Sequence, residues 1–138
     1  MKQSIFIFLF IICSCSNEVS EKDLKHLNGY WEIYRVESVN KKITEFKVNS
    51  TIDFYFIDNE NKGYRKKTSL DFSGVYKTNN IKDKVIIENK NGAYLLKTKT
   101  ALNNWEDRII NLTPENLVLK NKKGDVFYYK KHKKLNIN

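Results

Sequence analysis

Short runs of alternating apolar and polar residues recur along the chain from residue 30 onward, separated by residues that are typical of turns. The clearest run is Thr51–Asp58, where Ile52, Phe54 and Phe56 alternate with Asp53 and Tyr55. A period of two predicts a β-strand with one buried face. On the same grounds we predict eight strands: Tyr30–Ser38, Thr51–Asp58, Tyr64–Thr78, Lys84–Glu88, Ala93–Thr100, Trp105–Leu112, Leu117–Lys120 and Val126–Lys130.

The connections between these runs are short and rich in turn residues, as at Asn91-Gly92 and Thr113-Pro114. None is long enough for the crossover helix that parallel pairing requires, so we expect an antiparallel meander. Closing such a meander into a barrel removes its two exposed edges. The pattern therefore predicts an all-β protein built as an eight-stranded antiparallel up-and-down barrel.

Two segments interrupt the regular pattern. Gly74 lies within the long run Tyr64–Thr78 and indicates a bend, while Leu70, Phe72 and Tyr76 share one face of the predicted strand. The connection from residue 39 to 50 is longer than a hairpin loop, so it either forms a small extra hairpin or lies over the open end of the barrel as a lid.

A short helical turn is expected before the first strand. Ser20 followed by Asp23 is typical of a helix cap, the turn carries Leu24 and Leu27, and Gly29 ends it.

The first residues have the layout of an export signal. Lys2 precedes the apolar run Ile5–Ile12. The small residues Cys13 and Ser14 follow this run and are followed in turn by Cys15. The run is far shorter than the roughly 20 residues that a membrane-spanning helix needs.

Ile12-Cys13-Ser14-Cys15 resembles the lipobox of bacterial lipoproteins, in which an aliphatic residue at −3 and a small residue at −1 precede the cysteine. The resemblance implies cleavage before Cys15 and acyl chains on that residue, which would anchor the protein to a membrane of the bacterial cell envelope, expected to be the outer membrane at its periplasmic face or at the cell surface. Cys13 is the less suitable candidate because bulky Ile12 precedes it. We accordingly divide the chain into a signal peptide (1–14), the acylated cysteine and a polar tether (15–24), a barrel domain (25–134) and a C-terminal tail (135–138).

Gly29-Tyr30-Trp31, placed after a helical turn and at the start of the first strand, resembles the G-x-W motif of lipocalins. The C-terminal half is similar to the lipocalin-like domains of small bacterial lipoproteins, with Trp105 leading a strand, Leu112–Leu117 forming a turn and Phe127–Lys130 forming the last strand. The resemblance covers about residues 25 to 131 and implies a lipocalin-like (calycin) barrel whose floor is closed by Trp31 beneath the helix. No arginine follows the last strand, so Lys130 or Lys131 is expected to pack over Trp31.

The amino-acid composition bears on which partners and which stabilising bonds the protein has. The formal net charge is +9, but Arg35, Arg65 and Arg108 are the chain's three arginines, and arginine is the usual residue for reading phosphates and guanine edges. We therefore expect no nucleic-acid partner, and we interpret the lysines as solubilising, or as a means of holding the domain near anionic lipid headgroups. The two cysteines, Cys13 and Cys15, lie at or before the cleavage point, so the domain has no disulfide.

We find no motif for catalysis, metal binding or a cofactor. His26 and His132 lack a partner at metal-ligand spacing, and no serine stands in a nucleophile turn. The chain is therefore expected to be a monomeric binding protein without a cofactor, not an enzyme.

A small apolar or amphipathic ligand is the expected occupant of the barrel. The candidate ligand-binding residues are Trp31, Phe54, Phe56, Phe72, Tyr76, Tyr94 and Leu96, with Trp105 a further aromatic that could line a pocket. An eight-stranded barrel is only just wide enough for its own side chains or for one small ligand. The alternative is thus a filled barrel whose outer surface binds a protein, as a periplasmic inhibitor or an immunity-type factor would.

Overall fold

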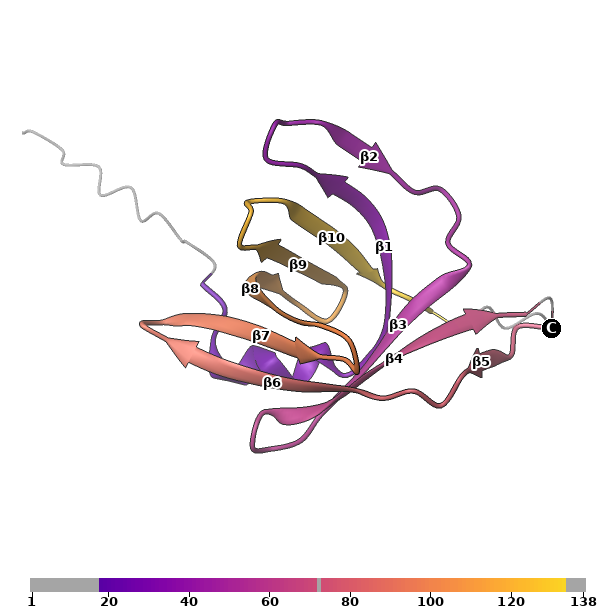
Figure 1. Cartoon of the computed structure of the whole chain (residues 1–138), viewed down its shortest axis with the longest axis horizontal. Helices are drawn as coiled ribbons and strands as arrows, with labels where there is room; N and C mark the ends of the chain where they lie inside the picture. Colours follow the sequence, from indigo (N-terminus) through magenta and orange to yellow (C-terminus); the bar gives the residue numbers. More distant parts are fainter. Residues whose placement is uncertain (1–17, 72, 134–138) are drawn as a thin grey trace, which may run out of the picture.

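The computed structural model describes residues 18–71 and 73–133 (Figure 1). The predicted signal peptide, Cys15, Phe72 and the tail 135–138 lie outside the described residues. The elements in chain order are the 3-10 helix η1 (Glu21–Leu27) and the strands β1 (Gly29–Glu37), β2 (Ile43–Glu45), β3 (Thr51–Ile57), β4 (Lys62–Leu70), β5 (Tyr76–Thr78), β6 (Asp83–Lys90), β7 (Ala93–Lys99), β8 (Asn104–Leu112), β9 (Asn116–Asn121) and β10 (Val126–Lys131).

Eight of these strands form a closed antiparallel barrel in the order β1, β3, β4, β6, β7, β8, β9, β10. The barrel closes because β10 pairs with β1 over the length of both strands, with Trp31 opposite Lys131 and Glu37 opposite Val126. The predicted fold class is therefore confirmed. The short strands β2 and β5 pair with β1 and β4 and stand outside this ring of eight.

One end of the barrel is closed by η1. The Asp23 carboxylate accepts hydrogen bonds from the backbone N–H of Ser20 at 2.8 Å and from its hydroxyl at 2.7 Å, which fixes the start of the helix. Leu24 and Leu27 are buried beneath the barrel. The Trp31 indole N–H donates to the carbonyl of Leu27 at 2.7 Å, so the fully buried Trp31 joins the helix to the first strand.

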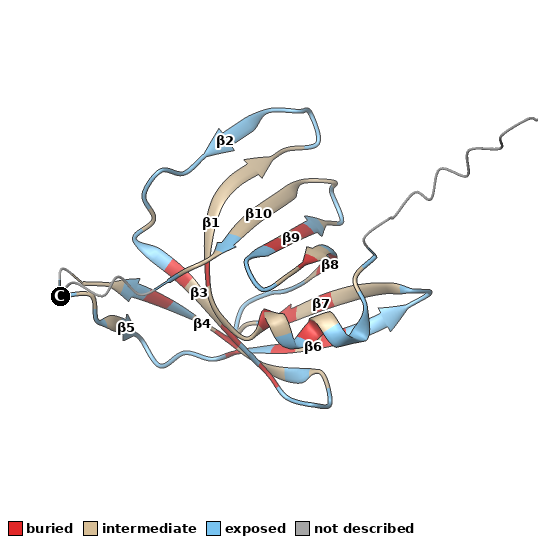
Figure 2. Cartoon of the chain, turned by 180° about the vertical axis from the view of Figure 1, so that it is seen from behind, coloured by how far each residue is buried: buried red, intermediate tan, exposed pale blue. Residues whose placement is uncertain are grey.

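The apolar core lies against this closed end. Figure 2 shows that buried residues are concentrated on η1 and on the strands around it. The buried residues of the core cluster are Leu24, Leu27, Trp31, Tyr55, Ile57, Val85, Ile87, Leu96, Ile109, Leu112, Leu117 and Leu119. Each large apolar side chain among them contributes roughly 1.5–3 kcal/mol by burial. All of these residues lie between positions 24 and 131, as do all the described strands.

The face assignment predicted for Thr51–Asp58 is wrong for Phe54 and Phe56, although Ile52 is buried. Tyr55 and Ile57 belong to the core cluster, and the strand pairs with β4 in an unbroken register. Because side chains alternate along a strand, Phe54 and Phe56 point outward, and Phe56 is 45% exposed. A shift of one residue in the assignment moves every side chain to the other face.

The predicted long strand Tyr64–Thr78 is also wrong, because the structure divides it into the hairpin β4–β5. The Asp71 carboxylate accepts from the backbone N–H of Ser73 at 2.9 Å and of Val75 at 3.0 Å, and Gly74 takes a φ of 74°. Such an Asp-initiated turn reverses the chain, so Tyr76 lies opposite Leu70.

The segment between β1 and β3 forms the extra hairpin that was one of the two predicted alternatives. Within it, β2 pairs with β1 and places Ile43 opposite Glu37.

Candidate functional site

A hollow of about 720 Å³ lies at the open end of the barrel, where β6 and β8 begin and β7 and β9 end. Thr98, Trp105, Asp107, Phe127 and Tyr129 line it from the inner face. Three of these are aromatic, so most of the inner wall suits an apolar group. The remaining lining residues are Lys84, Ile86, Lys97, Lys99, Asn104, Glu106, Asn121, Lys122 and Lys123.

Lysines dominate the rim of this hollow. Lys97 pairs with Glu88 and lies 3.9 Å from Glu106, and Lys122 lies 3.7 Å from Glu106. Five lysines, Lys84, Lys97, Lys99, Lys122 and Lys123, line this rim together with one carboxylate, Glu106. The rim is therefore a cationic border around an aromatic interior.

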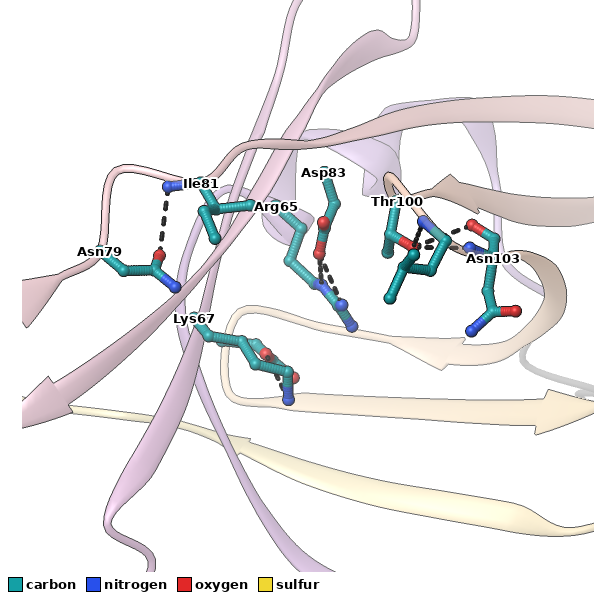
Figure 3. Close-up of polar contacts among 9 residues, drawn as sticks. Arg65, Lys67, Asn79, Ile81, Asp83, Thr100 and Asn103 are labelled. Atoms are coloured by element: carbon teal, nitrogen blue, oxygen red, sulfur yellow. Dashed lines mark hydrogen bonds and ion pairs between the residues drawn. The ribbon is translucent and has the colours of Figure 1, made fainter.

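A buried ion pair lies below the aromatic wall. The guanidinium of Arg65 on β4 donates two hydrogen bonds to the carboxylate of Asp83 on β6, the shorter being 2.7 Å (Figure 3). These residues lie directly opposite each other on neighbouring strands, so their side chains share the inward face. The guanidinium carbon also lies 5.0 Å from the centre of a Trp105 ring, which connects the ion pair to the wall of the hollow.

The charges around Arg65 fix its protonation. Burial alone would lower the pKa of Arg65, but neighbouring Tyr55, Asp53 and Asp83 raise it well above its ordinary value. Arg65 is therefore a permanent cation inside the barrel, and replacing it would leave carboxylates without their counter-charge.

Asp53 is an interior carboxylate with a buried oxygen, Oδ1, that accepts no hydrogen bond from a described residue. Its nearest cation, the ammonium group of Lys67, is 3.8 Å away. Burial raises the pKa of Asp53, and the opposite charges of Arg65 and Lys67 offset this only in part. Asp53 and Lys67 also line a second hollow of about 250 Å³, together with Trp31, Ile33 and Asn49 among others.

Burial also shifts the pKa values of other groups inside the barrel. It raises the pKa of Asp107, and the side chain of Trp105 and the charge of Arg65 oppose that rise. It also raises the pKa values of Tyr55 and Tyr129, so both phenols stay protonated and can act as hydrogen-bond donors. The interior of the open end therefore offers donors, acceptors and aromatic surface together.

The structure separates most of the sequence-predicted ligand residues from the larger hollow. Trp31 lies at the floor and lines only the smaller hollow, Leu96 is fully buried in the core, and Tyr94 packs partly buried against the core. Phe54, Phe56 and Tyr76 belong to ring contacts on the outside of the barrel. Phe72 lies outside the described residues.

Of the aromatic residues considered from sequence, Trp105 lines the larger hollow. The sequence reasoning missed Asp107, Phe127 and Tyr129, although alternation along Trp105–Asp107 and Phe127–Tyr129 places each pair on one face. Residues 18–71 and 73–133 contain no cluster of His, Cys, Asp and Glu side chains that could hold a metal ion. In the same part of the chain no helix has the length and apolarity needed to cross a bilayer.

The barrel has the fold of a lipocalin-like protein. No protein-family model and no curated protein sequence matches the chain. Among solved structures, the chain is similar to a lipocalin-like protein from Bacteroides uniformis ATCC 8492, with a TM-score of 0.52 and 14% sequence identity. The similarity covers 78% of this chain and 99% of that chain. At this identity the likeness establishes the fold alone.

Proposed function

We propose that this chain is a lipid-anchored binding protein of the bacterial cell envelope that holds one small amphipathic molecule in the open end of its barrel. The observation that carries the proposal is the hollow of about 720 Å³, whose inner wall includes Trp105, Phe127 and Tyr129. Ligand sites of this kind are concave, largely apolar and of several hundred cubic ångströms. A filled barrel that acts only through its outer surface would leave no such space.

The lining also suggests the character of the ligand. An apolar group would lie against the aromatic wall, while the lysines at the rim favour an anionic or strongly polar group at the outer end of the molecule. Asp107 and Tyr129 can fix the orientation of a ligand that carries a hydrogen-bond donor or acceptor near its middle. Binding rather than catalysis is the role that these groups support.

Native mass spectrometry tests the ligand proposal. The protein is purified from its own host and separated from the membrane lipids before it is measured. We expect a co-purifying species of one small molecule per chain, lost when Trp105 is replaced by Ala. A chain that carries no bound molecule, and that takes up none from a host lipid extract, would contradict it.

The membrane anchor rests on the export signal and on the placement of Cys15. Acyl chains contribute about 0.8 kcal/mol for each buried methylene, so two or three chains hold a protein to lipid effectively permanently. We expect Cys15→Ser to move the protein to the soluble fraction or to leave an unprocessed precursor. Cys13→Ser is the matched control and should leave membrane attachment unchanged.

A further inference from the structure

Five aromatic rings contact one another on the outside of the barrel, and none of them lines the larger hollow. Tyr30 stacks on Tyr76 with ring centres 4.1 Å apart and contacts Phe54 at 4.8 Å. Tyr64 contacts Phe54 at 6.2 Å and Phe56 at 5.5 Å. These rings come from β1, β3, β4 and β5, so they form a continuous aromatic area on the outer surface.

Lysines continue this area at one side. The ammonium groups of Lys66 and Lys82 lie 5.7 Å and 4.7 Å from the centre of the Tyr64 ring. Lys84 lies directly opposite Tyr64, and Lys99 lies directly opposite Lys84. We call this surface the aromatic–lysine face; it consists of Tyr30, Phe54, Phe56, Tyr64, Tyr76, Lys66, Lys82, Lys84 and Lys99. Lys84 and Lys99 also border the hollow, so the face reaches its rim.

The strand register orders the face into two rows. One row runs from Tyr30 through Phe54 to Lys66, each residue opposite the next. The second row runs through four residues in the same way: Phe56, Tyr64, Lys84 and Lys99. In each row the aromatic residues come first and lysine follows.

The lysines of this face lack counter-charges. No described carboxylate forms an ion pair with Lys66, Lys82, Lys84 or Lys99. The carboxylates of Glu60 and Glu88, in contrast, are paired with Lys62 and Lys97. Like charges directly opposite each other on an antiparallel pair destabilise the sheet, and Lys84 and Lys99 are such a pair. An external anion bound at this face would relieve that repulsion.

We propose that the aromatic–lysine face binds the anionic headgroup layer of a lipid bilayer. Aromatic rings with a polar edge are favoured at the boundary between headgroups and acyl chains. Each lysine near an anionic surface adds attraction that falls off within a Debye length. The face combines both features, and no described carboxylate pairs with its lysines. Its contact with lipid is additional to an anchor at Cys15 and does not depend on it.

Sedimentation with vesicles tests this proposal. The chain from residue 18 to 138 is used, because it contains every described strand and every core residue without the acylated segment; its sheet content is checked by circular dichroism. We expect it to sediment with vesicles of phosphatidylcholine and phosphatidylglycerol and to stay in solution with phosphatidylcholine alone. Lys66→Gln with Lys82→Gln should lower the partition coefficient roughly 30-fold, from the loss of two lysine contacts.

A charge-matched variant separates this face from net charge. Lys120 on β9 and Lys42 in the turn between β1 and β2 are exposed, form no ion pair with a described residue and do not line the hollow, and β9 lies across the barrel from β4. Lys120→Gln with Lys42→Gln should change binding less than 3-fold, and Phe56→Ser should weaken it at constant charge. Equal loss in both lysine pairs, or binding unaffected by anionic lipid, would overturn the proposal. So would self-association of the chain through Phe56 in place of vesicle binding.

Discussion

The ammonium group of Lys131 lies 4.2 Å from the centre of a Trp31 ring and donates hydrogen bonds to the backbone carbonyls of His26 and Asn28. The last strand is thereby joined to the first strand and to the helix at the closed end. This is the contact that the sequence led us to expect of Lys130 or Lys131 in place of an arginine. The burial that accompanies it lowers the pKa of Lys131.

Removing this contact should destabilise the barrel. Lys131→Met keeps the apolar stem but leaves two carbonyls without their charged donor, so we expect the free energy of unfolding to fall by about 2 kcal/mol. Lys130→Met is the control, because Lys130 is half exposed. Its ion pair with Glu32, at 3.7 Å, contributes less than about 1 kcal/mol. Urea unfolding followed by tryptophan fluorescence measures both. Equal effects would show that the Trp31 contact is unimportant.

The ion pair between Arg65 and Asp83 should be more sensitive than any surface pair. Both side chains are nearly buried, so Asp83→Ala leaves a guanidinium without its partner inside the barrel. We expect a loss of about 3 kcal/mol in the free energy of unfolding. Glu60→Ala breaks the exposed pair with Lys62 and should change it by less than about 0.5 kcal/mol. A small effect at Asp83 would mean that Arg65 finds a second partner, for which Asp53 is the nearest candidate.

Asp53 should give the barrel a distinct dependence on pH. Because burial raises its pKa, the folded protein binds this proton more tightly than the unfolded chain does. Stability contributed by this group therefore rises as pH falls through the raised pKa toward the ordinary value of 3.8 and is lost again as pH rises. Arg65, Lys67 and Asp83 face the same carboxylate, so the comparison must be made at constant salt.

The measurement is the difference in free energy of unfolding between the natural chain and Asp53→Asn across that pH range. We expect the natural chain to gain relative to the variant as pH falls, and the difference to become constant below 3.8. A relative loss over the same interval would show that the Lys67 and Arg65 charges outweigh burial.

Ligand affinity should depend on the inner aromatic wall. Trp105→Ala removes the ring that covers Arg65 and lines the hollow, and the lost burial should weaken binding of an anionic amphipathic dye at least about 10-fold. Tyr34→Ala is a suitable control because its ring contacts Tyr128 and lines none of the described hollows. Fluorescence titration of the dye compares them. Equal weakening in the two variants would place the dye elsewhere on the protein.

Alternation and turn chemistry were sufficient to predict the barrel, because antiparallel hairpins leave few topologies for a chain of this length. They were insufficient for β3, where Tyr55 and Ile57 compete with Phe54 and Phe56 for the inner face and both faces are rich in large apolar residues. The inner face also carries Asp53. A carboxylate is accepted there because Arg65 and Lys67 face it, and hydropathy gives no indication of such a partnership.

The hairpin β4–β5 was within reach of sequence reasoning. Asp71 followed by Gly74 is typical of a turn, but alternation on both sides of it favoured a single strand. The pairing of Arg65 with Asp83 was not within reach, because the two residues are 18 positions apart and meet only through the register of β4 and β6. The hollow depends on five strands at once, β6 to β10, and therefore had no local signature.

The plug formed by η1 and Trp31 makes the two ends of the barrel unequal. A molecule that enters between the rim lysines must leave by the same route, because the floor is packed with leucine and tryptophan side chains. Such a protein can store a molecule or hand it over to an acceptor, but it cannot conduct one from end to end. Release will then require the molecule to leave the aromatic wall and to pass the rim side chains on the way out.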